Sequence, residues 1–231
     1  MQRLVLALLG ASAVVTASAA SASVTINFNS PANTDPGPTA TFGPITATGY
    51  TCGDVLCETS GVQTNLYIKD EGAGEQGLGL NNDPSGQHEI WYPQEVIPLS
   101  FVQLDVSALL GLTNSASFMM NSTTAGEGWA VFGSNTAGFI DGSPFFSALH
   151  GNDELSHDFI DWGSFKYYDF LSQGTNPGLH AAFGNVLLSS VTYNPSVPEP
   201  ATWAMMLLGF GAMGVAFRRR RRTTITLPQL A

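Results

Sequence analysis

The segment Ser23-Val-Thr-Ile-Asn-Phe-Asn29 alternates apolar and polar side chains, which puts Val24, Ile26 and Phe28 on one face. A repeat of two residues is typical of a β-strand with one buried face. The alternation recurs along the chain, at residues 61–69, 99–106, 115–121, 128–133, 164–171 and 185–193. We therefore expect a succession of short strands that share one core.

Turn-forming residues separate these segments. Clusters of Asn, Asp, Pro, Gly and Ser occupy residues 33–38, 81–86, 141–144 and 175–178. No long segment repeats every 3.6 residues, and the one helical expectation within this part of the chain is a short helix at 106–112. Many short strands in one unit predict an all-β fold: an antiparallel β-sandwich, jelly-roll-like, over residues 23–196.

The composition supports this fold class and restricts the partners. Only 11% of residues are charged, and helix-favouring Lys, Glu and Arg are scarce. Within 23–196 two lysines, Lys69 and Lys166, stand against seventeen acidic residues, a net charge of −15. Such a body repels phosphate backbones, so we expect no binding to nucleic acid. An acidic surface also keeps an exported protein soluble.

The N-terminus has the three parts of a secretion signal. Arg3 supplies the positive charge, residues 4–15 are apolar, and small residues follow to Ser23. This order is that of a signal peptide over residues 1–22, with cleavage after Ala22 or Ala19. The sequence thus predicts export through the Sec translocon and removal of the signal by signal peptidase.

The C-terminal segment combines an apolar stretch with a basic cluster. Residues 201–217 carry no charge, and a helix of that length is about 25 Å long, near the lower limit for a bilayer core. Pro198 and Pro200 mark where the helix begins. Trp203 suits one membrane interface and Arg218–Arg222 the cytoplasmic side. We expect one transmembrane helix in the inner membrane, followed by a short cytoplasmic tail, residues 223–231.

Pro198-Glu199-Pro200, Trp203-Ala204, the glycine-containing apolar stretch and the arginines resemble the PEP-CTERM sorting signal in its PEPxxWA form. The same region is also catalogued as an ice-binding-protein C-terminal domain. The resemblance covers residues 197–222. It implies an exosortase as partner, cleavage near Pro-Glu-Pro, and a surface or exopolysaccharide-associated protein of Gram-negative bacteria. The residues it marks are Pro198, Glu199, Pro200, Trp203, Arg218, Arg219, Arg220, Arg221 and Arg222.

Two cysteines, Cys52 and Cys57, are separated by four residues. In an oxidising compartment such a pair forms a disulfide, here a local one because the loop is short. A structural zinc site needs four ligands, and no second cysteine pair exists.

An acidic stretch is the candidate metal site. Residues 150–161 contain two histidines and four carboxylates: Asp153, Glu154, Asp158 and Asp161. Hard oxygen ligands favour Ca²⁺, so weak Ca²⁺ binding is one hypothesis and a solvated loop the other. Gly72–Gly77 formally matches G-x-G-x-x-G, but the residues that follow do not favour a helix, so we interpret it as a flexible loop without cofactor.

Aromatic residues give a second candidate site. Trp91, Tyr92, Trp129 and Trp162 could form a platform on which sugar rings stack, although aromatic side chains in β-sandwiches more often belong to the core. No G-x-S-x-G elbow occurs, and no catalytic residues are predicted. Thr39-Ala-Thr41 and Thr46-Ala-Thr48 are isolated pairs, which disfavours ice binding.

Three functions remain open from the sequence. The first is a non-enzymatic surface or matrix protein, sorted by exosortase and associated with exopolysaccharide or biofilm. The second is a carbohydrate-binding module that uses surface aromatics, and the third is a secreted hydrolase. For all three we expect a membrane-anchored precursor with a periplasmic body, which then reaches the cell surface or the medium.

Overall fold

The structure is a computed structural model that describes residues 22–53, 61–72, 74–91, 99–123, 127–140, 148–151, 153–174, 185–196 and 200–220. The chain divides into two compact units. One is the body, Ala22–Ser196, and the other comprises the two ends of the chain, Met1–Ser21 and Val197–Ala231. Each unit is described by itself below.

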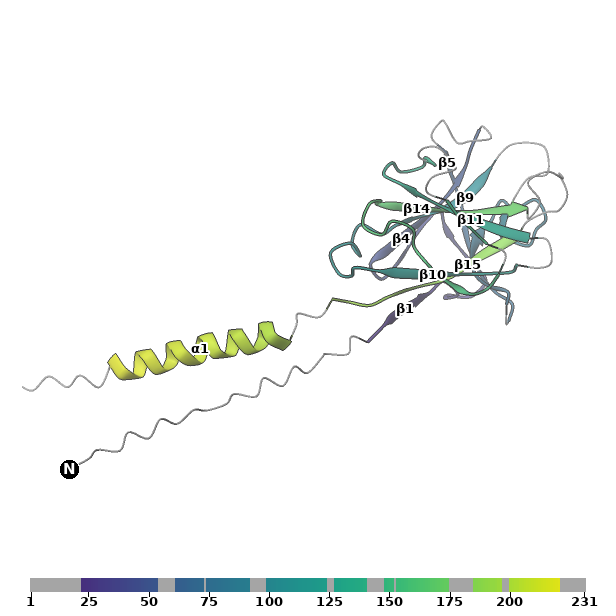
Figure 1. The fold of residues 1–231 in the computed structure, drawn as a ribbon. Coiled ribbons are helices and arrows are strands. Elements are labelled where there is room, and N and C mark those ends of the chain that lie inside the picture. The colour runs from purple at the N-terminus through teal and green to yellow at the C-terminus, as the bar shows by residue number, and fades with distance from the viewer. Residues whose placement is uncertain are drawn as a thin grey trace, which may run out of the picture. The chain divides into compact units, whose positions relative to one another are not determined.

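The body contains two antiparallel sheets (Figure 1). The eight-stranded sheet has the order β13-β10-β15-β7-β6-β2, and β1 and β8 also pair with β15. Its strands are β1 Val24–Asn27, β2 Thr34–Gly37, β6 Leu66–Asp70, β7 Gln76–Leu80, β8 Ile90–Trp91, β10 Ala116–Asn121, β13 Ser156–Asp158 and β15 Asn185–Tyr193. Every described pairing in it is antiparallel.

The seven-stranded sheet has the order β12-β11-β14-β9-β4-β3, and β5 also pairs with β4. Its strands are β3 Thr39–Phe42, β4 Ile45–Thr51, β5 Val62–Thr64, β9 Ser100–Asp105, β11 Glu127–Ser134, β12 Ala148–Gly151 and β14 Tyr167–Gly174. The predicted all-β class and the two antiparallel sheets are therefore confirmed. The jelly-roll-like detail stays a prediction.

The main core lies between the sheets and is rich in aromatic rings. Phe118 is central: its ring meets those of Trp129 and Phe170 edge-on, with centroids 5.3 and 5.2 Å apart. Offset and edge-to-face ring pairs are the favoured geometries for aromatic side chains. A smaller cluster on the seven-stranded sheet includes Tyr50 stacked on Phe101.

Most strands predicted from alternation are present, and the predicted face of the first is correct. Phe28 is fully buried and Ile26 packs against the core. Four expectations were wrong. Residues 33–38 contain β2 rather than a turn alone, and residues 72–77 lead into β7 rather than forming only a loop. Residues 106–112 form hydrogen-bonded turns rather than a helix. Residues 150–161 contain β13 rather than only a loop. In the 106–112 segment the amides of Leu109 and Leu110 both bond the Val106 carbonyl, and those of Leu112 and Thr113 both bond the Leu109 carbonyl, so two successive turns form rather than a continuous helical ladder.

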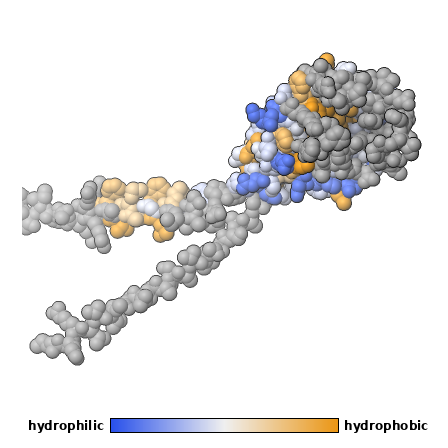
Figure 2. Space-filling view, turned by 45° about the horizontal axis from the view of Figure 1, so that its top comes forward, coloured by the Kyte–Doolittle hydropathy of each residue, from blue (hydrophilic) through white to orange (hydrophobic). Residues whose placement is uncertain are grey.

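The C-terminal unit contains one described helix, α1, which spans Pro200–Arg220. Its described side chains are exposed and largely apolar, as Figure 2 shows; Leu207, Leu208 and Phe217 are each about two-thirds exposed. The predicted helix is therefore present. Among the described residues, however, no helix combines the length and the apolar character needed to cross a membrane, so the predicted transmembrane helix is not supported.

Glycine at position 79 is required by packing. Gly79 faces away from the core, and a Cβ atom there would lie 2.1 Å from the backbone oxygen of His88. We expect Gly79→Ala to destabilise the body by about 2–3 kcal/mol, because backbone cannot move as easily as a side-chain end. Urea unfolding measures the loss. Gly111→Ala is the matched control, since no atom lies within 4 Å of a Cβ there; equal losses for both variants would contradict the packing argument.

Candidate functional site

The body's most unusual site begins with an alternation of leucine and glycine in β7. Leu78 and Leu80 point into the core and are fully buried. Gly77 and Gly79 face the opposite side, where their partners on β6 are Lys69 and Tyr67. Because Gly79 has no side chain, His88 and Glu89 of the chain that follows β7 can lie directly against this outer face of the sheet. At Gly77 the close neighbour is the backbone of Leu188 in β15.

The segment that folds back, residues 81–89, is held by its own turn and leads into β8. Asp83 is nearly buried, and its carboxylate accepts hydrogen bonds from the Ser85 amide at 2.9 Å, the Ser85 hydroxyl at 2.6 Å and the Glu89 amide at 3.3 Å. His88 has a left-handed backbone, φ 61°, and its ring stacks on Tyr67 with centroids 4.0 Å apart. These contacts place the side chain of Glu89 over β6.

Lys69 is the centre of the site. Its side chain is 5% exposed, yet its Nζ donates hydrogen bonds of 2.7 Å to both Glu75 Oε2 and Glu89 Oε1. Glu71 lies further away, at 3.7 Å. Burial by itself would lower the pKa of Lys69, but the hydrogen bonds from the two glutamates outweigh it and raise that pKa to about 12. The lysine is therefore a permanent cation in the fold.

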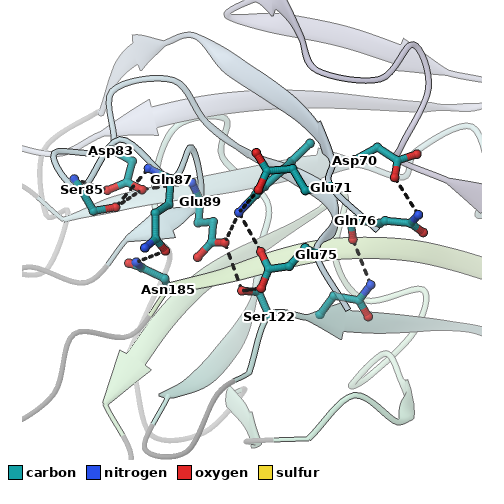
Figure 3. Close-up of polar contacts among 12 residues, drawn as sticks. Asp70, Glu71, Glu75, Gln76, Asp83, Ser85, Gln87, Glu89, Ser122 and Asn185 are labelled. Carbon is teal, nitrogen blue, oxygen red and sulfur yellow. Dashed lines mark hydrogen bonds and ion pairs between the residues drawn. The ribbon is translucent and has the colours of Figure 1, made fainter. Parts of the chain in front are cut away.

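The two glutamates differ in environment. Figure 3 shows Glu71, Glu75, Glu89 and Ser122 converging on one spot. The Glu89 side chain is 1% exposed, and this burial raises its pKa to about 7 although Lys69 opposes the shift. Glu75 is 40% exposed; burial would raise its pKa too, but the hydrogen bond from Lys69 leaves that pKa below its usual value.

Ser122 connects the two carboxyl groups from a third part of the chain. It follows β10, has a left-handed backbone with φ 59°, and is buried. Its Oγ lies 3.0 Å from Glu75 Oε1 and 3.1 Å from Glu89 Oε1. We call Lys69, Glu71, Glu75, Glu89 and Ser122 the Lys69 cluster. Since the Glu89 side chain is 1% exposed, Glu75 and Glu89 cannot flank a substrate bond as the two carboxyl groups of a glycosidase do.

The predicted calcium ligands do not converge. Asp153 Oδ1 lies 2.6 Å from His157 Nε2, and this hydrogen bond lowers the pKa of Asp153. Asp158 lies in β13, and Asp161 occupies a left-handed turn position. Within the described ranges, which include these residues and Glu154, no group of three or more His, Cys, Asp or Glu side chains could hold a metal ion. The structure gives the Ca²⁺ hypothesis no common site at these positions.

The predicted aromatic platform also has to be corrected. Trp129 is fully buried in the core, where its indole donates to the Asp153 carbonyl at 3.2 Å, so it cannot offer a face to a sugar. Trp162 is half-buried and donates to the Thr113 carbonyl at 3.1 Å. Trp91 is half-buried in β8. Tyr92 lies outside the described residues.

Cys52 is buried, 1% exposed, at the end of β4. The described part of the chain contains no free cysteine. Cys57, the predicted partner of Cys52, lies outside the described residues, so the Cys52–Cys57 disulfide stays a prediction.

The predicted sorting residues lie around α1. Pro200 is its first residue, Trp203 is 52% exposed, and Arg218 is exposed near its C-terminal end. Arg219 and Arg220 complete the helix. Pro198, Glu199, Arg221 and Arg222 lie outside the described residues.

Comparison with known proteins assigns this C-terminal segment. Residues 196–221 match a family model described as the PEP-CTERM protein-sorting motif. The chain is thus a protein with a PEP-CTERM sorting motif, as the sequence predicted, and this motif implies exosortase-dependent sorting to the cell surface. No curated protein and no solved structure matches the chain.

Removing the central cation tests the energetics of the cluster. Lys69→Met leaves Glu75 and Glu89 together without their partner, and breaking a buried ion pair on one side costs about 3–5 kcal/mol. We expect a loss of about 3 kcal/mol in urea unfolding, since Glu75 remains in contact with water. Lys166→Met is the matched control, because Lys166 is the body's other lysine and is exposed. A loss no larger than that of the control would show that Lys69 is not needed for stability.

Proposed function

We propose that the protein is a non-enzymatic surface or extracellular-matrix protein, sorted by exosortase and associated with exopolysaccharide or biofilm. The observation that carries the proposal is the sorting motif at residues 196–221. Its partners are the Sec translocon, signal peptidase, the inner membrane and an exosortase. The precursor holds the body, residues 23–196, on the periplasmic side, and processing then delivers it to the surface or the medium.

Two features of the body support a role without catalysis. The carboxyl groups of Glu75 and Glu89 are occupied by Lys69 and Ser122. The net charge of the body is strongly negative, which favours solubility over adhesion to other acidic surfaces. The carbohydrate-binding alternative loses Trp129 as a stacking surface, because that ring belongs to the core.

Processing at both ends follows from the proposal. Protein extracted from the cell surface should begin near Ala20 or Ser23 and end near Pro198-Glu199-Pro200. Intact-mass measurement decides this, and a product that retains both Met1 and Ala231 would contradict the sorting proposal. Replacing Arg218–Arg222 with Ser is the companion variant, and it leaves the sequence of the body unchanged. We expect the precursor of this variant not to be retained in the membrane before processing, because positive residues fix the orientation of a membrane segment.

Association with polysaccharide needs a separate measurement. We expect the processed protein to co-sediment with extracellular polysaccharide purified from the producing cells, and to do so without shortening the polymer. Trp91→Ala tests whether the half-buried indole of β8 takes part. A protein that stays in the supernatant would remove the polysaccharide half of the proposal while leaving the sorting half intact.

A further inference from the structure

The Lys69 cluster has fewer hydrogen atoms than its contacts require. Ser122 has a single hydroxyl hydrogen, yet its Oγ lies within hydrogen-bond distance of both Glu75 Oε1 and Glu89 Oε1. If both glutamates were ionised, at least one of these short contacts would join two acceptors. One additional proton on the glutamate pair removes the conflict.

The charges lead to the same count. One ammonium, that of Lys69, faces the buried Glu89 and the half-exposed Glu75, and both carboxylates are 2.7 Å from it. Two ionised glutamates would leave an excess negative charge beside a side chain that is 1% exposed. Burying an unbalanced charge is unfavourable, and the group takes up a proton instead. With one proton shared, the lysine and the glutamate pair are neutral as a set.

The other titratable groups near the cluster are exposed or bound to other partners. Glu154, which precedes β13, is exposed, and its Oε1 lies 3.8 Å from the Cβ position of Gly74 in the β6–β7 connection. From the β6–β7 connection, Glu71 lies 3.7 Å from Lys69 but is 64% exposed, so water screens its charge. Asp70 of β6 accepts a hydrogen bond from Gln76 at 2.7 Å. On the return segment, Asp83 binds its own turn and the His88 ring stacks on Tyr67. On β15, which packs against Gly77, the nearest residues are Leu187 and Leu188.

We propose that Glu75 and Glu89 hold one proton between them in the folded protein, and that this proton fastens the segment 81–89 to the outer face of the eight-stranded sheet. When the proton is lost, the buried Glu89 carboxylate repels Glu75, and the segment that carries Glu89 loosens first. The rest of the sheet stays paired, because β6 and β7 are hydrogen-bonded to each other independently of this contact.

The direction of the pH dependence follows from Glu89. Its pKa in the fold, about 7, is above its usual value of 4.5, so the folded state holds the proton more tightly than the unfolded chain. The stability that this proton supplies is complete below pH 4.5 and is lost as the pH rises through about 7. Glu75 acts in the opposite sense and weakens the fold only in more acidic solution, where it too becomes protonated.

The test measures the melting temperature of the full chain and of Glu89→Gln from about pH 5.5 to about pH 8.5. Near-ultraviolet circular dichroism monitors the unfolding. We expect the melting temperature of the unsubstituted protein to fall by about 3 °C or more across this range. Glu89→Gln, which is neutral at every pH, should show at most a third of that fall. Glu71→Gln, the exposed neighbour, should keep the unsubstituted profile. A fall that is the same in all three proteins would overturn the proposal.

Two measurements locate the effect. Side-chain carboxyl ¹³C NMR of the unsubstituted protein should show one glutamate that titrates near pH 7. Hydrogen exchange at one alkaline pH should be faster in residues 81–89 of the unsubstituted protein than in Glu89→Gln, with the β6 amides unchanged. These readings need no binding partner, and the NMR reading stands even if the variant does not fold. If every glutamate titrates in the ordinary acidic range, no proton is shared.

Discussion

An ammonium group on the face of a β-sheet, almost out of contact with water, is the constraint around which one side of this protein is organised. Lys69 Nζ is 2.7 Å from Glu89, which is equally inaccessible. The contact requires the segment after β7 to fold back over the sheet, which in turn requires glycine at position 79, while Gly77 admits the backbone of β15 at Leu188. A buried charge is tolerated only with such partners, so sheet, turn and Gly79 depend on one another.

Much of the fold could be predicted because strands with one solvent-exposed face alternate apolar and polar residues. The segments that became β1, β9, β10, β11 and β15 all show this alternation. β7 was missed because glycine takes the place of the polar residues in its alternation, so the pattern resembles a loop. β2 was missed because Pro36 and Gly37 are turn formers; its pairing with β6 is in fact irregular between Thr34 and Gly37.

The site was harder to predict, because its members come from distant parts of the chain. Lys69, Glu89 and Ser122 are separated by twenty and thirty-three positions, and no local pattern links them. One signal was present: Lys69 is one of two lysines in the body and stands within an alternating strand. By contrast, the acids at 153–161 are close in sequence but form no common metal site among the described residues, so local density of carboxylates was a poor guide.

The first and last strands of the body are neighbours: β1 pairs with β15, and Val24 is opposite Tyr193. β15 also receives β7, β8 and β10. During export the N-terminal end of the chain emerges first. Four strands, β1, β7, β8 and β10, therefore have no partner in β15 until that last strand has emerged. The eight-stranded sheet cannot close until residue 193 has crossed, three residues before the sorting motif begins. Completion of the fold therefore coincides with arrival of the segment that carries the sorting motif.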